Sequence, residues 1–348
     1  MSFNPVLIVA KTEKPEWYKA TSHYAKPDTA TSIRQLLSAL VSYFLLLALM
    51  GYFVRHDYPY SITLAFGVAA AALFSRIFIF FHDCTHGSFF PSPRWNRNVG
   101  YLCGILTFTA FHDWRRSHAR HHITAGDLDR RGIGEITTMT VAEYLAASPL
   151  QRLSYRLYRH PLIMFGIGPL YYFLLRNRYP APGGKKIDFI SVIVTNLAIA
   201  AIIVTASLTV GFRTYFLVQF PVLVLAATLG IWLFYIQHQF QGVYWSRHDG
   251  WDAWRVVMEG ASYYKLPKPL QWVTGNIGFH HVHHMRPGIP NYRLQECYAA
   301  VPELRQVQPI TIRTGFTSLR LNLYDEQQRR MVSFRSLKGR SCAGPFTP

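Results

Sequence analysis

The stretch "SITLAFGVAAAALFSRIFIFFHDCTH" at residues 61–86 runs from an apolar segment directly into two histidines. Its apolar part, residues 61–81, has the length of about 20 residues that a helix needs to cross the hydrocarbon core of a membrane. His82 and His86 follow immediately, and their spacing would place both imidazoles on one face of a continuing helix. This junction predicts a membrane-spanning helix that carries candidate metal ligands at its end.

Three other apolar stretches have a similar length and lie at residues 35–54, 188–210 and 215–237. The four stretches pair as two hairpins, at about 35–81 and 188–238, each closed by a short turn. Arg76 is the one charge inside the second stretch. We expect its side chain to extend to the membrane interface, as long cationic side chains near helix ends do.

Two weaker apolar segments, residues 99–111 and 161–175, are predicted to lie on the membrane surface or to re-enter it. The first is short for a span, and the second contains Gly166, Gly168 and Pro169. If residues 99–111 spanned the membrane alone, the histidines before and after them would face opposite sides. The histidine positions and the hydropathy therefore favour the same four-span topology.

This topology places the N-terminus, residues 82–187 and residues 239–348 on one side of the membrane, and these parts hold nearly all the Lys and Arg. Positive residues collect in cytoplasmic loops, so we expect this side to be the cytoplasm. Only 16% of residues are charged, whereas soluble domains have about 25%. The net charge of +18 comes without a recognisable nucleic-acid module, so we expect no nucleic acid as partner. A basic cytoplasmic face instead attracts anionic lipid and acidic proteins.

The predicted fold is thus one domain over residues 1–348, an all-α membrane protein. Four transmembrane helices in two hairpins carry a helical cytoplasmic cap, and the cap holds a histidine-rich site for two metal ions.

The histidines of this site form three clusters, each with helical spacing, and a ninth histidine ends the fourth span. The clusters are "HDCTH" with His82 and His86, "SHARHH" with His118, His121 and His122, and "HHVHH" with His280, His283 and His284; the ninth is His238. Nine nitrogen ligands are too many for one ion but suit two, with positions left for water or dioxygen. Imidazole binds Zn, Cu, Fe and Ni, so ligand type leaves the metal open. Spacing also leaves open which ion each histidine binds.

Other polar residues near the clusters have supporting roles in this interpretation. Asp83 is expected to orient a histidine, as carboxylates next to metal ligands often do. His281 points off the face shared by its neighbours, so it is expected to support the ligands, and His112 is expected to support the site or to be structural. Isolated histidines are expected to be ordinary polar residues; they are His23, His56, His160 and His248. The carboxylate-rich Glu-x-x-His pattern of ferritin-like di-iron proteins does not occur.

In their order and topology, "HDCTH", "HARHH" and "HHVHH" resemble the three histidine boxes of integral-membrane fatty acid desaturases. The segments "DLDRRG" (127–132), 135–175 and "FYIQHQF" (234–240) are similar to the bacterial acyl-lipid branch. The resemblance implies a non-haem di-iron centre, two Fe ions with O2 as co-substrate, that introduces a cis double bond. It also implies a multi-pass protein of the bacterial inner membrane.

The same resemblance indicates the substrate and the electron source. The first box reads HxxxH and the third begins with His280, which favours an acyl chain esterified in membrane glycerolipid. Because the chain has no ferredoxin cysteine pattern and no GxGxxG motif, electrons must come from outside. An acidic donor such as ferredoxin, docking on the basic face, is expected.

Two alternatives remain. Related histidine-box enzymes are hydroxylases or ketolases acting on alkanes, carotenoids or sphingolipids. A transition-metal transporter would also place histidines near membrane helices, but its ligands should line a pathway inside the spans, where this sequence has essentially none.

Overall fold

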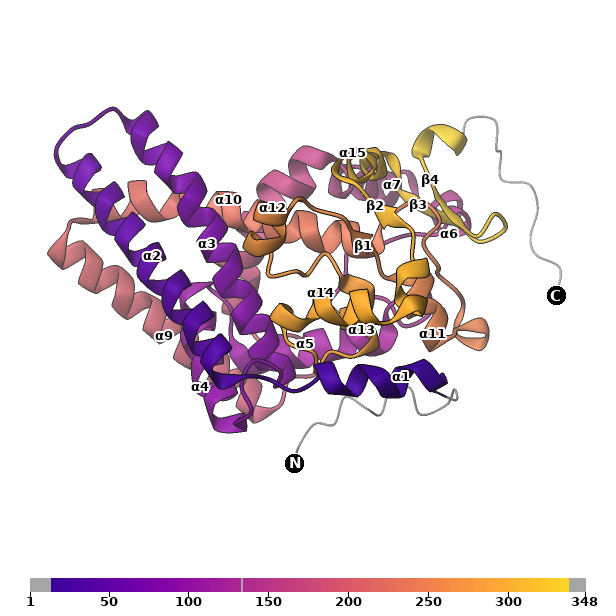
Figure 1. Ribbon diagram of the computed structural model, residues 1–348. Helices are drawn as coiled ribbons and strands as arrows, with labels where there is room; N and C mark the ends of the chain where they lie inside the picture. Colours follow the sequence, from indigo (N-terminus) through magenta and orange to yellow (C-terminus); the bar gives the residue numbers. More distant parts are fainter. Residues whose placement is uncertain (1–13, 133, 338–348) are drawn as a thin grey trace.

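The computed structural model describes residues 14–132 and 134–337, which are mostly helical. In the described residues, four helices are long and apolar enough to cross a membrane: α2 (Thr29–Arg55), α3 (Tyr60–His86), α9 (Lys186–Thr209) and α10 (Phe212–His238). They form two antiparallel pairs that extend to one side of the molecule, while the other helices and loops gather on the opposite side (Figure 1). The predicted hairpins are confirmed. Helices α2, α3 and α10 extend past both of their predicted bounds, whereas α9 begins two residues earlier than predicted and ends one residue earlier.

Local signals fix the ends of these helices. The Asp28 side chain accepts a hydrogen bond from the Thr31 N–H at 2.7 Å and so caps the start of α2. Gly87, with a positive φ of 73°, ends α3 directly after His86. Helix α3 is the most buried of the four, because α2, α10 and α4 (Pro93–Leu106) all pack against it. The histidines at its end therefore project into the centre of the molecule.

Arg76 departs from the prediction. Its side chain is buried within the protein, with only 4% of the residue exposed. Its guanidinium lies 4.3 Å from the ring centroid of Trp272 in α12 (Lys268–Val273) and donates to the Trp272 carbonyl. A cation–π contact and a hydrogen bond thus replace water around this charge.

Neither of the weaker apolar segments is among the candidate spans of the described chain. The first corresponds to α4 and a tight turn, after which α5 (Phe111–Thr124) carries the second histidine cluster. The second is a helix with widened turns at Ile163–Ile167 and Tyr171–Leu175, on either side of α8 (Gly168–Leu170). It packs sideways against α10, where Thr228 donates to the Phe165 carbonyl at 2.8 Å.

The remaining elements gather opposite the long helix pairs, and we call this part of the molecule the cap (Figure 1). Two short sheets of two strands each are the only departures from the predicted all-α fold within the described ranges. The cap elements are α1 (Glu16–Ala20), α6 (Val141–Ala146), α7 (Pro149–Tyr158), α11 (Ala253–Arg255), α13 (His280–Met285), α14 (Asn291–Ala300), α15 (Ile312–Thr317), the parallel pair β1 (Tyr263–Tyr264) and β2 (Pro309–Ile310), and the antiparallel pair β3 (Leu323–Asp325) and β4 (Arg330–Val332).

Candidate metal centre

The nine predicted histidines converge in two groups, and each group could hold a metal ion. Within each group the ligand nitrogens all lie within 4.8 Å of one another. The first group has five members and the second has four: His82, His86, His118, His122 and His283 in the first, His121, His238, His280 and His284 in the second. Helices α5 and α13 contribute to both groups, whereas α3 serves only the first and α10 only the second.

In the four-membered group three imidazole nitrogens converge on one another. The Nδ1 of His238 lies 2.9 Å from the carbonyl oxygen of Gly260, so Nδ1 carries the proton and Nε2 has a free lone pair. That Nε2 is 3.1 Å from Nε2 of His121 and 3.0 Å from Nε2 of His280. Imidazole nitrogens that converge at this spacing can share one cation, so this arrangement fits a bound metal.

The five-membered group has the same geometry. Nε2 of His122 lies 3.2 Å from Nε2 of His118 and 3.0 Å from Nε2 of His283. Adjacent nitrogens around a six-coordinate ion with metal–nitrogen bonds of ~2.1 Å would be ~3.0 Å apart. The donor set and its spacing therefore fit a transition metal in each group.

Burial favours the neutral, metal-binding form of several of these histidines. Loss of solvation, reinforced by neighbouring imidazoles, lowers the pKa of His118, His121 and His283 well below the ordinary histidine value. Aromatic rings also fix the imidazoles. The Trp114 ring stacks on His118 with centroids 4.2 Å apart, and the Phe234 ring lies 5.3 Å from that of His121. The ligands are therefore held in place and shielded from water.

Asp83 lies beside the ligands, where a carboxylate can orient a histidine. One of its oxygens is 3.2 Å from Nδ1 of His82, and the other accepts from the backbone N–H and side-chain amide of Asn291. His281 lies outside both groups and packs against Tyr263 and Tyr298.

His112 is also outside both groups, and its backbone N–H donates to Ser191 on α9. Sequence reasoning missed three contributors to the site, namely Asn291, the Gly260 carbonyl and Trp114. Only Trp114 has a local signal, its position four residues before His118 on α5.

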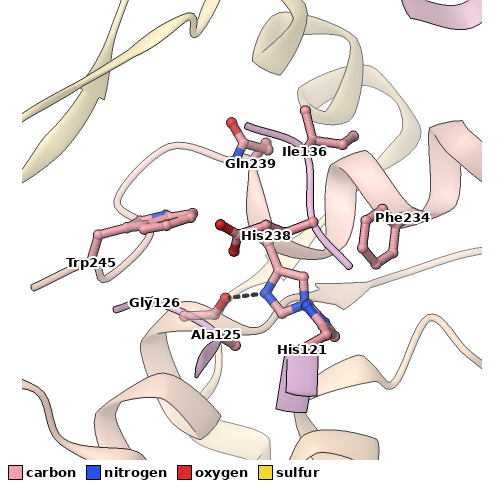
Figure 2. A pocket seen from close by; sticks show the side chains of 10 residues that line it. His121, Ala125, Gly126, Ile136, Phe234, His238, Gln239 and Trp245 are labelled. Atoms are coloured by element: carbon pink, nitrogen blue, oxygen red, sulfur yellow. Dashed lines mark hydrogen bonds between the residues drawn. The ribbon is translucent and has the colours of Figure 1, made fainter. Parts of the chain in front are cut away.

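A small cavity adjoins the four-membered group. Figure 2 shows His121 and His238 facing the space that Gln239 and Trp245 border from other sides. Glu135 also lines it and accepts a hydrogen bond from the Gly132 N–H at 2.8 Å. The cavity is large enough for roughly one water molecule, so a small molecule can lie next to these two histidines.

The fold and the two histidine groups define a protein with membrane-length helices and two candidate metal sites, and comparison with known proteins gives its family. A sequence model of fatty acid desaturases matches residues 59–315. The chain is 43% identical to the fatty acid desaturase of Bacillus subtilis (strain 168) over 92% of its own length and 90% of that protein.

More distant relatives extend the comparison. The chain is 27% identical to the sn-1 acyl-lipid omega-3 desaturase (ferredoxin) of Synechocystis, over 68% of this chain and 66% of that protein. It is also 27% identical to a chloroplastic omega-3 fatty acid desaturase of Sesamum indicum, over 72% of this chain and 60% of that protein. The chain belongs to the fatty acid desaturase family, and the enzyme is an oxidoreductase.

Proposed function

We propose that this enzyme uses dioxygen to introduce a cis double bond into an acyl chain of membrane glycerolipid. The observation that carries the proposal is the convergence of nine histidine nitrogens in two groups where α3 and α10 end. A site at the ends of these two helices can receive an acyl chain from the bilayer while the rest of the lipid stays in the membrane. The Synechocystis relative, whose name specifies an acyl-lipid substrate, supports the same substrate class.

In this proposal the two groups each hold one iron ion, the five-membered group through His82, His86, His118, His122 and His283 and the four-membered group through His121, His238, His280 and His284. Two bound irons would supply the dioxygen activation that breaking an unactivated C–H bond requires. The surrounding residues orient the histidines and exclude water from the site. Gly260 and Asp83 orient His238 and His82, while Trp114 and Phe234 exclude water from the imidazoles.

The stoichiometry requires an external electron source. Removal of two hydrogens from the chain, with reduction of one dioxygen to two waters, consumes two electrons and two protons. We propose that an acidic one-electron carrier of the ferredoxin type supplies the electrons at a cytoplasmic face in the bacterial inner membrane. The formal charge of +18 supports this, because an acidic protein is drawn to a basic face, and the Synechocystis relative's name includes ferredoxin.

The geometry gives no support to the other candidates. Hydroxylation would need the same centre, and no observation favours oxygen insertion over loss of a second hydrogen. A metal transporter should have ligands along the interior of its spans. In the described chain both histidine groups are formed by the ends of α3 and α10 together with α5 and α13, and not by residues along the interior of the long helices.

Expression in a host of simple lipid composition tests the proposal. With a ferredoxin and its reductase supplied, chromatography of fatty acid methyl esters should show a new unsaturated species that is absent with His283→Ala. A hydroxylated fatty acid in its place would identify a hydroxylase. Unchanged lipids, with iron-loaded protein present in the membrane, would contradict both activities.

A further inference from the structure

Helix α7 turns its apolar side chains away from the protein. Leu150, Leu153 and Leu157 recur at helical spacing and are 75%, 54% and 53% exposed. The opposite face is the packed one, where the buried Tyr155 donates to the Asn322 carbonyl at 2.6 Å. A surface helix of a soluble domain turns its apolar stripe toward the core. Because the apolar stripe of α7 faces outward, this face of the helix suits contact with an apolar medium.

The helical segment 161–175 follows α7 in the chain and contacts it at Ile163–Ile167. That segment has its own exposed apolar residues: Leu162, Ile167, Tyr171 and Leu175. Its Phe165 carbonyl accepts from Thr228, which lies about 15 Å along α10 from His238. The segment therefore lies beside the membrane-length part of α10, where exposed apolar residues suit contact with lipid. Helix α7, which precedes this segment in the chain, has the same kind of exposed apolar surface.

A hollow with two arginines adjoins the leucine stripe. Arg152 and Arg156 line it together with Leu153 and Tyr144. Both guanidinium groups lie over the Tyr144 ring, with distances of 5.9 and 5.8 Å to the centroid. Among the ion pairs of the described residues, neither arginine pairs with a carboxylate. Positive charge without an acidic partner, next to an apolar stripe, is the composition of a helix that lies on phospholipid.

We propose that α7 lies in the plane of the membrane surface, on the leaflet nearest the metal centre. Its three leucines enter the boundary between headgroups and acyl chains, and Arg156, at the edge of the stripe, contacts lipid phosphate. The partner is a phospholipid leaflet with anionic headgroups. This contact attaches the cap to the bilayer independently of the four long helices, and it requires no particular chemistry at the metal centre.

Spin-label accessibility tests the position of α7. Leu153→Cys and Leu157→Cys are made singly in a Cys342→Ser background, labelled with a nitroxide, and reconstituted as full-length protein in phosphatidylcholine–phosphatidylglycerol vesicles. The nitroxide should collide with oxygen more often than with a water-soluble nickel chelate. Leu197→Cys on α9 is the positive control, because Leu197 is 65% exposed on a membrane-length helix. Gln295→Cys, on the exposed side of α14, is the control for a label in water. If the labels on α7 also collide more often with the nickel chelate, the proposal is overturned.

A second measurement tests the phosphate contact. Spin-labelled phosphatidylglycerol should associate with the wild-type protein more strongly than phosphatidylcholine does. Arg156→Gln should reduce this preference, Arg156→Lys should retain most of it, and Arg305→Gln, an exposed arginine of the cap, should leave it unchanged. An undiminished preference in Arg156→Gln would overturn the phosphate contact.

Discussion

The carboxylate of Asp83 accepts hydrogen bonds from both the backbone N–H and the side-chain amide of Asn291, at 2.7 and 2.9 Å, across 208 residues of chain. Asp83 lies between the two histidines of the first cluster, and Asn291 begins α14, shortly after the third cluster. The pair therefore connects two of the three histidine clusters, although neither residue belongs to a histidine group. Both residues are buried, with exposed fractions of 2% and 1%.

Replacing Asn291 should weaken iron binding. Asn291→Ala removes the side-chain hydrogen bond and leaves a buried carboxylate oxygen with one partner fewer, so His82 loses part of its orientation. Changes to such supporting partners typically cost about 10–100-fold in metal affinity. Titration of iron into metal-free protein measures the effect, and Gln295→Ala on the same helix is the control. Wild-type affinity in Asn291→Ala would show that the pair is only structural.

The two histidine groups should lose iron separately. His283→Ala removes a nitrogen from the five-membered group, and His284→Ala removes one from the four-membered group. Each variant should lose activity and retain about one iron of the expected two, because the other group keeps its full donor set. Iron analysis of purified protein, with Mössbauer spectroscopy to distinguish the sites, checks this. His23→Ala, an exposed histidine far from both groups in the sequence, should keep full activity and both irons.

Loss of both irons from either ligand variant would mean that the two sites bind cooperatively. In that case the division into groups would describe positions in the fold and not independent sites.

Much of this centre could be predicted because its signals are local. Apolar length identified the four candidate membrane helices, and three- and four-residue spacing identified eight of the nine histidines that converge in the two groups. The division into groups was not predictable, since it separates chain neighbours: His121 and His122 belong to different groups, as do His283 and His284. That division depends on how α5 and α13 face each other, which is a tertiary property.

The burial of Arg76 was equally hidden in the sequence. A lone arginine near the end of an apolar span indicates contact with the interface, and nothing local connects it to Trp272 almost 200 residues later. The docking of α12 on α3 supplies an aromatic face and a carbonyl that compensate the buried charge.

Replacing Gly278, which lies two residues before His280 of the third cluster, should destabilise the protein. A Cβ there would overlap the carbonyl oxygen of Tyr264, while the Tyr264 N–H donates to the Gly278 carbonyl at 2.7 Å. Gly278→Ala must push these backbones apart, which should cost about 1–3 kcal/mol and displace His280. Thermal unfolding in detergent and iron content measure the two effects. Gly230→Ala is the matched control, because a Cβ at that helical position meets nothing within 4 Å. Equal melting temperatures for the two variants would contradict the prediction.

Acid should destabilise the metal-free protein and release iron in the same pH range. Burial, the largest cause, holds the pKa of His118, His122 and His280 well below the ordinary value. Below pH ~6.5 the unfolded chain therefore binds more protons than the folded chain, so the free energy of unfolding falls as the pH falls. Iron binding also requires neutral imidazole, so protons compete with the metal over this range. We expect the melting temperature of chelator-treated protein to decrease from pH 7.5 to pH 5. We expect the iron content of protein that was not treated with chelator to decrease over the same pH range. A melting temperature that stays constant over this interval would mean that the imidazoles are already solvated, and charged in acid, in the folded state.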